Sequence, residues 1–474
     1  MIAVKTFFKT ISQTRLNPKI KSVRKSAKTQ RNRKQLFFAA LCSFASRREG
    51  FFHNESRVQK QALLICVLCA FVVSCSPPDQ LKQAYPETVT FSVKNPAAIA
   101  RQDAAIVFDL AALKTKAPEF NDKAFVVLHN ARELPSQTID RNNDGSVDAI
   151  VCVADFAANE AQALTVRYAK SGVLAREYPK RTQAELSHKV GGRFVNRKYE
   201  GGTFQNVQSL RVPPEHTDHS FYIRYEGPGW ESDKIGYRFY LDWRNATDIF
   251  GKRTAAMVLQ NVGQDGFDSY HAISDWGMDV LKVGESLGLG SLAMWYEGKA
   301  QRVAQTDSIT CAITANGTVQ ARIQTKYFGW KAGGGVYDVI SNLSINAGSR
   351  LTEHNVMIAG EPQNLCTGIV KLDSAVTLAA PESNAQWTYL ATYGKQSLVP
   401  DQLGMAVLYR KSDLIEVAED QHSRVVVLKP VEGRLTYYFL GAWEQEPGGI
   451  TSPEAFAAYL DQTVAELNTP LVLE

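Results

Sequence analysis

Short runs in which apolar and polar residues alternate recur along this chain, separated by turn-forming residues. Because successive side chains of a β-strand point to opposite faces, a period of two is typical of strands that bury one face. Five such runs precede residue 170: Thr88–Val93, Ala105–Phe108, Phe125–Leu128, Ala149–Val153 and Leu164–Tyr168. Their spacing predicts a small antiparallel β-sandwich over residues 86–170.

The rest of the chain is also predicted to be mostly β. All seven Trp residues lie from Trp230 onward, and the polar stretch 171–200 is expected to be a linker. Asn316-Gly317 between two alternating runs predicts a hairpin. Ser452 before Pro453 and an apolar face reaching Leu467 predict one helix. We therefore expect a large antiparallel β-sandwich over residues 201–474, ending in that helix.

Positive charge is concentrated at the N-terminus. Residues 1–60 hold fifteen Lys and Arg against two acids, whereas the remainder holds 38 basic and 46 acidic residues, a net charge of −8. The Lys/Arg/Gln/Ser composition of residues 1–57 would not build a core. We interpret this segment as a basic leader that reflects a mis-called start, with a genuine basic extension as the alternative. The net-acidic remainder gives no reason to expect a nucleic-acid partner.

An uncharged apolar run, 62–73, follows this basic segment. It is shorter than the ~20 residues of a membrane span but suits the apolar part of a secretory signal. It ends at Val72-Val73-Ser74-Cys75, which resembles the lipobox of bacterial lipoproteins. We predict a lipoprotein signal over 58–75, acylation of Cys75 and a flexible tether over 76–85, with a buried core helix as the alternative. The protein is then expected in the periplasm or outer membrane of a Gram-negative bacterium, touching the membrane only through its lipid.

One acidic loop resembles the start of a calcium-binding loop. Oxygen-bearing side chains occupy its positions 1, 3, 5 and 9, namely Asp140, Asn142, Asp144 and Asp148, and Gly145 stands at position 6. Position 12 is Val151, so the bidentate acid is missing, and an ordinary Asn-Asp-Gly turn is the alternative. A structural calcium is the one cofactor that the sequence suggests, and none is required for activity.

Aromatic, acidic and cationic residues are densest in residues 227–244 and 270–284. Aromatic rings stack on the apolar faces of sugars, and Arg grips carboxylates through two parallel hydrogen bonds. This mixture favours a sugar site over a sheet whose charges merely pair with one another. The predicted substrate-binding residues are His219, Trp230, Glu231, Asp233, Trp243, Arg244, Asp279 and Trp443.

Two histidines three residues apart, His216 and His219, raise the question of a metal site that His271 would complete. On a strand, two side chains at this spacing point to opposite faces, so the zinc signal is weak. We expect these histidines to lie at the surface or to contact substrate.

The segments Trp230–Arg238 and Tyr270–Gly284 resemble signature stretches of an uncharacterised bacterial domain family. Its members are secreted or lipid-anchored proteins encoded among pectin- and ulvan-degrading enzymes. The resemblance extends from the first β-domain through Tyr437–Trp443 to the C-terminal helix. It implies a large β-sandwich like those of mutarotase-type sugar-binding folds, and lyase or dehydratase chemistry on oligosaccharides that contain uronic acids. The family often has acidic residues where this chain has His219 and Tyr222, so a different substrate preference within the family is an open alternative.

β-Elimination on a uronate needs a cation for the carboxylate, a base for the neighbouring proton and an acid for the leaving oxygen. Arg238, Arg244 and Lys282 are the predicted cations. His271 is the predicted base, since an unperturbed imidazole has a pKa of about 6.5. Tyr240 or Tyr270 is the predicted acid. The partner is then an acidic oligosaccharide.

Two other classes of protein fit the same residues. A glycoside hydrolase would use two carboxylates roughly 5–9.5 Å apart, for which Glu231, Asp233, Asp242 and Asp279 are candidates. A non-catalytic sugar-capture lipoprotein would instead use Trp230, Trp243 and Trp443 as a stacking platform.

Overall fold

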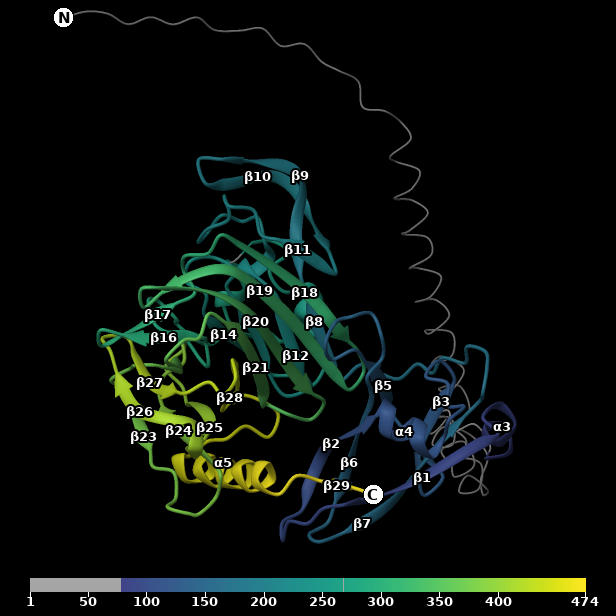
Figure 1. Cartoon of the computed structure of the whole chain (residues 1–474). Coiled ribbons are helices and arrows are strands. Elements are labelled where there is room, and N and C mark those ends of the chain that lie inside the picture. The colour runs from purple at the N-terminus through teal and green to yellow at the C-terminus, as the bar shows by residue number, and fades with distance from the viewer. Residues whose placement is uncertain (1–77, 267) are drawn as a thin grey trace, which may run out of the picture. The chain divides into compact units, whose positions relative to one another are not determined.

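The computed structural model of the protein describes residues 78–266 and 268–474, which fold mainly into antiparallel sheets (Figure 1). The expected fold class, mostly β with a C-terminal helix, is confirmed. The basic leader, the signal segment and Cys75 lie outside the described residues, so these predictions stay predictions. Within 78–266 and 268–474, no helix has the length and apolar character needed to cross a membrane.

The five runs predicted before residue 170 all lie in strands of two sheets. The five-stranded sheet has the order β29 (Val472–Leu473), β1 (Glu87–Lys94), β7 (Ala161–Tyr168), β3 (Phe125–His129), β4 (Arg132–Leu134). The three-stranded sheet has the order β2 (Arg101–Asp109), β6 (Ala149–Phe156), β5 (Ser136–Ile139). Their apolar faces share one core that includes Phe91, Phe108 and Ile150. Helix α4 (Leu110–Lys116) begins at Asp109, whose carboxylate accepts hydrogen bonds from the first turn, and it adds Leu113 to that core.

Both ends of the described chain pack onto these two sheets. Helix α3 (Pro78–Ala84) occupies much of the expected tether, and Leu81 and Tyr85 are buried against β3. The prediction of a flexible tether is therefore wrong for residues 78–85, because two apolar side chains anchor them. At the other end, β29 pairs with β1, which the sequence did not indicate.

Strands β9 (Ser187–Val195) and β10 (Lys198–Asn206) pair only with each other, and the remaining strands form one large and two smaller antiparallel sheets. The nine-stranded sheet has the order β11 (Ser209–Arg211), β18 (Ser308–Asn316), β19 (Gln320–Ala332), β20 (Gly335–Asn346), β21 (Thr352–Ala359), β28 (Arg434–Trp443), β25 (Leu403–Arg410), β24 (Trp387–Gly394), β23 (Ala375–Leu378). One five-stranded sheet has the order β15 (Gly277–Asp279), β14 (Thr247–Lys252), β13 (Gly236–Phe239), β12 (Gly229–Ser232), β8 (Thr182–Glu185). The other has the order β17 (Lys299–Arg302), β16 (Ala293–Tyr296), β22 (Leu365–Val370), β27 (Ser423–Leu428), β26 (Leu414–Glu419).

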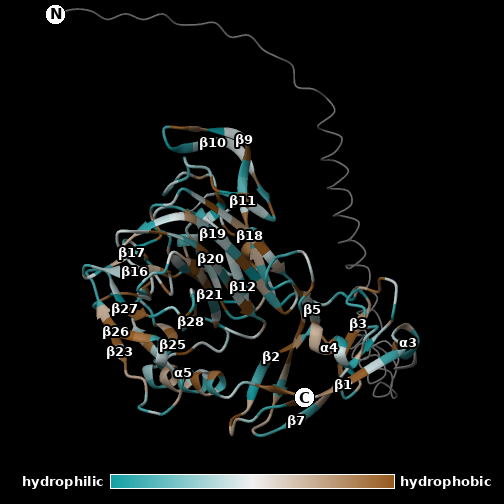
Figure 2. Cartoon of the chain, in the orientation of Figure 1, coloured by the Kyte–Doolittle hydropathy of each residue, from teal (hydrophilic) through white to brown (hydrophobic). Residues whose placement is uncertain are grey.

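The largest core lies where the two smaller sheets pack on the nine-stranded sheet. Trp230 and Tyr237 from β12 and β13 contact Phe439 of β28, with ring centroids 6.4 and 5.6 Å from the Phe439 ring. Hydrophobic residues follow strands such as β2 and β25, whereas the β9–β10 hairpin is largely hydrophilic (Figure 2). Burial of this apolar surface is the main force that joins the sheets.

Two local predictions are confirmed in this region. Asn316-Gly317 lies at the turn between β18 and β19, which pair along their length. The C-terminal helix α5 (Pro453–Asn468) is capped by Ser452, whose hydroxyl accepts a hydrogen bond from the Ala455 N–H at 3.1 Å. Phe456 and Leu460 bury its apolar face.

Strands occupy much of the expected linker, 171–200. Strand β8 completes the sheet that contains β12, and β9 (Ser187–Val195) pairs with β10 (Lys198–Asn206) in a separate hairpin. The segment without strands therefore ends at residue 181. All four residues of β8 are buried on both faces by distant parts of the chain, which its Thr-Gln-Ala-Glu sequence does not reveal.

Candidate functional site

Three adjacent strands, β13, β14 and β15, carry a buried charge network centred on Arg238. Arg238 and Asp248 stand directly opposite each other in the β13–β14 register. The Arg238 Nη2 donates to Asp248 Oδ2 at 2.7 Å and also to Asp279 Oδ2 on β15. The three side chains are at most 3 % exposed. One guanidinium thus bridges two buried carboxylates on neighbouring strands.

Two tyrosines enclose this arginine. Tyr240 donates to Asp248, and Arg238 Nη2 lies 3.1 Å from the Tyr240 oxygen. Arg238 Nη1 donates to the Tyr270 oxygen at 2.8 Å. Both ring centroids lie 4.9 Å from the Arg238 guanidinium carbon, a distance at which the ring face attracts a cation. Burial raises the pKa of both phenols, so both are protonated at neutral pH.

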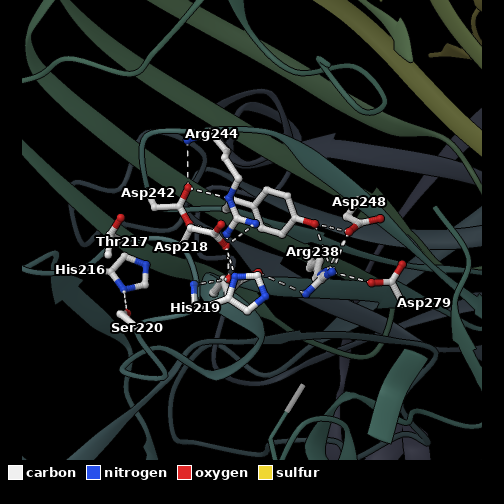
Figure 3. Close-up of polar contacts among 12 residues, drawn as sticks. His216, Thr217, Asp218, His219, Ser220, Arg238, Asp242, Arg244, Asp248 and Asp279 are labelled. Atoms are coloured by element: carbon white, nitrogen blue, oxygen red, sulfur yellow. Dashed lines mark hydrogen bonds and ion pairs between the residues drawn. The ribbon is translucent and has the colours of Figure 1, made fainter. Parts of the chain in front are cut away.

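A second arginine extends the network toward the surface. Arg244 contacts Asp242 at 2.5 Å, Glu226 at 2.8 Å and Asp218 at 2.9 Å. Its guanidinium carbon also lies 4.0 Å from the centroid of the Tyr240 ring. Glu226 joins the two arginines, since its other oxygen is 3.7 Å from Arg238 Nη1. Figure 3 shows the resulting chain of contacts from Asp242 to Asp279.

The segment from 212 to 228 supplies Asp218 and Glu226, and its backbone is strained. A Cβ on Gly227 would lie only 1.7 Å from the Phe239 carbonyl oxygen, so only glycine lets this segment pack against the end of β13. His219 and Glu226 have φ values of 54° and 73°, in the left-handed region. Such strained residues cluster at functional sites.

Two partly exposed histidines flank the network. His271, the last residue of η3 (Asp268–His271), has its Nε2 3.3 Å from Asp279 Oδ2 and a side chain that is 39 % exposed. His219 Nδ1 contacts Asp218, and its side chain is 50 % exposed. Each imidazole is therefore placed by a carboxylate and reaches solvent.

The carboxylates of the network differ in their affinity for protons. Burial, reinforced by the charge of Asp279, raises the pKa of Asp248 to about 7 despite the attraction of Arg238. Burial also acts on Glu226, but Arg238 and Arg244 outweigh it and lower its pKa to about 2. Burial raises the pKa of Asp218. The site thus places proton-holding and ionised carboxyl groups side by side.

A cavity of about 850 Å³ borders the Arg244 end of the network. Residues 211–217, 241–243 and 304–309 line it, together with Lys331 and the tip of the β9–β10 hairpin. Trp243 is 42 % exposed there, with the Arg302 guanidinium 5.3 Å from its ring centroid. An exposed indole beside a cavity of this size suits a sugar ring.

The structure brings together most of the residues predicted to act on substrate. The network contains His219, Arg238, Tyr240, Arg244, Tyr270, His271 and Asp279. Lys282 is exposed on the segment that follows β15. Trp243 faces the cavity instead.

Four predicted substrate-binding residues lie in the core or in structural ion pairs. Trp230 and Trp443 are 1 % and 0 % exposed, so they cannot form a stacking platform with Trp243. Glu231 is fully buried against Lys252, with 2.6 Å between carboxylate and ammonium. Asp233 binds Arg181, which also holds Asp103 of β2. The period-two pattern did not reveal that the nine-stranded sheet covers this face.

Sequence reasoning missed Glu226 and Asp248. Glu226 lies one residue before the stretch 227–244, in which aromatic and charged residues are densest. Asp248 would have emerged from pairing residues 236–239 with 247–250 as a hairpin, because that register places it opposite Arg238.

The calcium-like loop connects β5 and β6. Asp140 accepts hydrogen bonds from the Asp144 and Gly145 N–H groups at 3.2 and 2.7 Å, and Asp148 accepts one from the Arg141 N–H at 2.5 Å. These contacts define a tight turn, and calcium binding stays a prediction. Cys152, Cys311 and Cys366 are buried, unpaired thiols.

The family model described as "Domain of unknown function (DUF4861)" matches residues 93–473, and the chain belongs to this family. The expected membership of an uncharacterised family is thus confirmed, and its link to pectin and ulvan stays a prediction. No curated protein matches the chain.

The chain also matches solved structures at low similarity. An α-mannosidase from Enterococcus faecalis V583 is 9 % identical with a TM-score of 0.39, over 84 % of this chain and 47 % of the mannosidase chain. A protein in glycosyl hydrolase family 38 from Enterococcus faecalis is 8 % identical with a TM-score of 0.38, over 82 % of this chain and 47 % of that chain. The chain therefore spans about half the length of these proteins.

Proposed function

We propose that this DUF4861 protein processes oligosaccharides that contain uronic acids, by β-elimination at the network around Arg238. The observation that carries the proposal is the contact between His271 and Asp279. A buried carboxylate orients the partly exposed imidazole and stabilises its protonated form, as a general base requires. His271 would remove the proton beside the uronate carboxylate.

Tyr270 is the better of the two predicted acids. Tyr240 already donates its proton to Asp248. The Tyr270 oxygen accepts from Arg238, so its own hydrogen points elsewhere, and its ring centroid lies 4.8 Å from that of His271. Because Tyr270 is buried, a sugar oxygen could reach its hydroxyl only from the side of His271. Tyr270 would then protonate that oxygen as it leaves.

The predicted roles of Arg238 and Arg244 need revision. Arg238 is held by Asp248 and Asp279, and Arg244 by three carboxylates. Because these charges are already neutralised, we assign both arginines to positioning the acids and phenols rather than to binding a uronate. The cavity beside Trp243 would hold the sugar chain.

Product analysis tests the reaction class. Purified protein is incubated with saturated and lyase-generated ulvan or pectin oligosaccharides, and the ultraviolet absorbance of an unsaturated uronate is followed. We expect this absorbance to rise for wild type and not for His271→Ala, which should still bind substrate. His422→Ala is the matched control, because His422 is equally exposed and contacts Glu285 at 3.2 Å outside the network. If the His271→Ala variant is active, His271 is not the base.

Hydrolysis is the second candidate, favoured by one observation. One carboxylate oxygen of Asp218 lies within 4.8 Å of one of Glu226. The surroundings raise the pKa of Asp218 and lower the pKa of Glu226. Two such carboxyl groups are typical of the acid and nucleophile of a glycosidase. Reducing ends without new absorbance, lost in Asp218→Asn, would establish this alternative. Binding without product would favour the sugar-capture protein.

We also propose that the chain is exported and anchored through Cys75, so that it meets acidic oligosaccharides in the periplasm or at the outer membrane. Mass spectrometry of the protein from cells would show an acylated N-terminal Cys75. Cys75→Ala should release the protein from the membrane fraction, and an unchanged distribution would contradict the anchor.

A further inference from the structure

We propose that Asp218, His219 and Glu226 bind one divalent cation at the exposed side of the network. This cation would supply the positive charge that the two arginines cannot offer to a uronate carboxylate. The role toward substrate rests on the proposed elimination, whereas the binding of the ion does not.

The three side chains converge on one point. One ligand atom of each, two carboxylate oxygens and an imidazole nitrogen, lies within 4.8 Å of the other two. The Glu226 carboxylate accepts a hydrogen bond from the His219 N–H at 3.0 Å, which places these two residues together. Mixed oxygen and imidazole ligands suit Mn²⁺ and Zn²⁺ better than Mg²⁺, which prefers oxygen alone.

The whole network carries an excess of negative charge. It contains five carboxylates, on Asp218, Glu226, Asp242, Asp248 and Asp279, but only two guanidinium groups. Asp248 can hold a proton, and the other four carboxylates with the two guanidinium groups give a formal charge of −2; most of these groups are buried. Excess charge of one sign is costly away from water. A divalent cation would neutralise this charge.

The arginines leave room for such an ion on the carboxylates. Arg244 contacts Asp218 through Oδ1 and Glu226 through Oε1. We assign the second oxygen of each carboxylate, Asp218 Oδ2 and Glu226 Oε2, to the cation. Glu226 Oε2 also lies 3.7 Å from Arg238 Nη1, which is beyond hydrogen-bond length.

His216 provides an independent observation. It is 8 % exposed, and its Nδ1 lies 2.8 Å from the Ser220 hydroxyl. Its Nε2 is buried and has no hydrogen-bond partner among the described residues. Figure 3 shows His216 on the same side of the network as Asp218 and Asp242, with its one drawn contact to Ser220. Because an unpaired buried imidazole nitrogen is unfavourable, a water bound to the ion would complete the contacts of His216 without making it a ligand.

At this place the ion would do what elimination requires. A metal-bound carboxylate stabilises the negative charge that develops when the neighbouring proton leaves. The protein's own residues keep the other tasks, since His271 accepts that proton and the network positions His271 through Asp279. A net-acidic site can bind a polyanion in this way without further basic side chains.

Ion binding is tested on the full chain after chelator treatment, by calorimetric titration with Mn²⁺ and then with Zn²⁺ and Ca²⁺. We expect Mn²⁺ or Zn²⁺ to bind, and Asp218→Asn and Glu226→Gln to weaken this binding at least about tenfold, the lower bound seen when outer-shell groups are removed. Glu285→Gln, which alters an exposed carboxylate beside His422, is the control and should bind as wild type does. Asp144→Asn reports on the calcium-like loop separately.

A spectroscopic measurement does not depend on the stability of the variants. Paramagnetic resonance of Mn²⁺ bound to wild type should show coupling to an imidazole nitrogen, and His219→Gln should remove it. The inference is overturned if wild type binds none of the three ions, or if binding survives Asp218→Asn and disappears with Asp144→Asn.

The outcomes separate this inference from the proposed function. If the protein binds metal but forms no unsaturated product, the proposed elimination is wrong and the proposed metal site stands. Elimination that continues undiminished after chelation would overturn the role of the ion. Chelation should weaken binding of a uronate oligosaccharide at least about tenfold, comparable to loss of one good charge-assisted contact, and leave a neutral oligosaccharide unaffected.

Discussion

Two buried ion clusters lie on the same five-stranded sheet, and they differ in charge balance and in access to solvent. Lys252 and Glu231 form a closed pair in which both side chains are 0 % exposed. The remaining acceptor sites of Glu231 are used by the Val258 and Leu259 N–H groups. The Arg238 network has more acids than bases and reaches solvent through His271.

Charges buried for stability and charges buried for function differ in how completely they are paired. A balanced pair with every hydrogen bond satisfied holds strands together and has nothing left for a ligand. An unbalanced cluster, with a carboxyl pKa raised to about 7 and strained residues at its edge, is stable only because the fold imposes it. We therefore assign the first to the fold and the second to function.

The largest expected effect comes from breaking the balanced pair. Lys252→Ala would leave Glu231 as an unpaired buried charge and lower the free energy of unfolding by about 3–5 kcal/mol. Urea denaturation measures this change. Glu231→Leu combined with Lys252→Met should recover most of the loss, since it removes both charges together. A loss below about 1 kcal/mol for Lys252→Ala would contradict the structural assignment.

The unbalanced cluster should respond in turnover rather than in stability. Asp279→Asn keeps the shape of the side chain but weakens the orientation of His271, so we expect turnover to fall by about 100-fold, in the range of general-base effects. Because both residues act as one unit, adding His271→Ala to this variant should cause little further loss. If the fold-losses in turnover of the two single variants multiply in the double variant, Asp279 does not act through His271.

Asp248 should make stability depend on pH. Its pKa is about 7 in the folded protein and near 3.8 when unfolded, so the folded state holds an extra proton between these values. The contribution is present in full below about pH 4 and is lost as the pH rises to about 7. Asp248→Asn, which mimics the protonated acid, should flatten the free energy of unfolding over this window. Glu226, with a pKa of about 2, contributes in the opposite direction only below its ordinary value of 4.5.

The smallest effect is expected at the cavity. Trp243→Ala should weaken binding of an oligosaccharide about fivefold, which corresponds to ~1 kcal/mol for one aromatic contact. Trp295→Ala, which removes another partly buried indole on β16, is the control. Equal binding by wild type and Trp243→Ala would place the sugar elsewhere.

Local patterns predicted most strands but only some of their partners. The turn-forming stretch Pro430–Gly433 separates two apolar runs, a pattern that predicts a strand pair, and both runs are strands. Yet β27 belongs to a five-stranded sheet and β28 to the nine-stranded sheet. Alternation reports only that a strand has two different faces, whereas the neighbour in a sheet is chosen by residues far away in the chain.

The stretch from 236 to 244 shows how far the candidate site was predictable. In an alternating run, Arg238, Tyr240, Asp242 and Arg244 fall on one face and Tyr237 and Trp243 on the other. The first four residues do belong to one network. The strand itself ends at Phe239, and the following turn exposes Trp243, whereas Tyr237 is fully buried. The side-chain chemistry was predictable, and the burial of each ring was not.

The sequence by itself determined most of the strands, the capped C-terminal helix and the polar face around Arg238, because each depends on neighbours within a few residues. Only the tertiary structure decided which of these residues can meet a ligand. Trp230 is closed off by contacts that include Thr352, 122 residues away, and Asp279 meets Arg238 across 41 residues. Burial and charge balance arise from such distant contacts, and they separate the structural Glu231 from the functional Asp279.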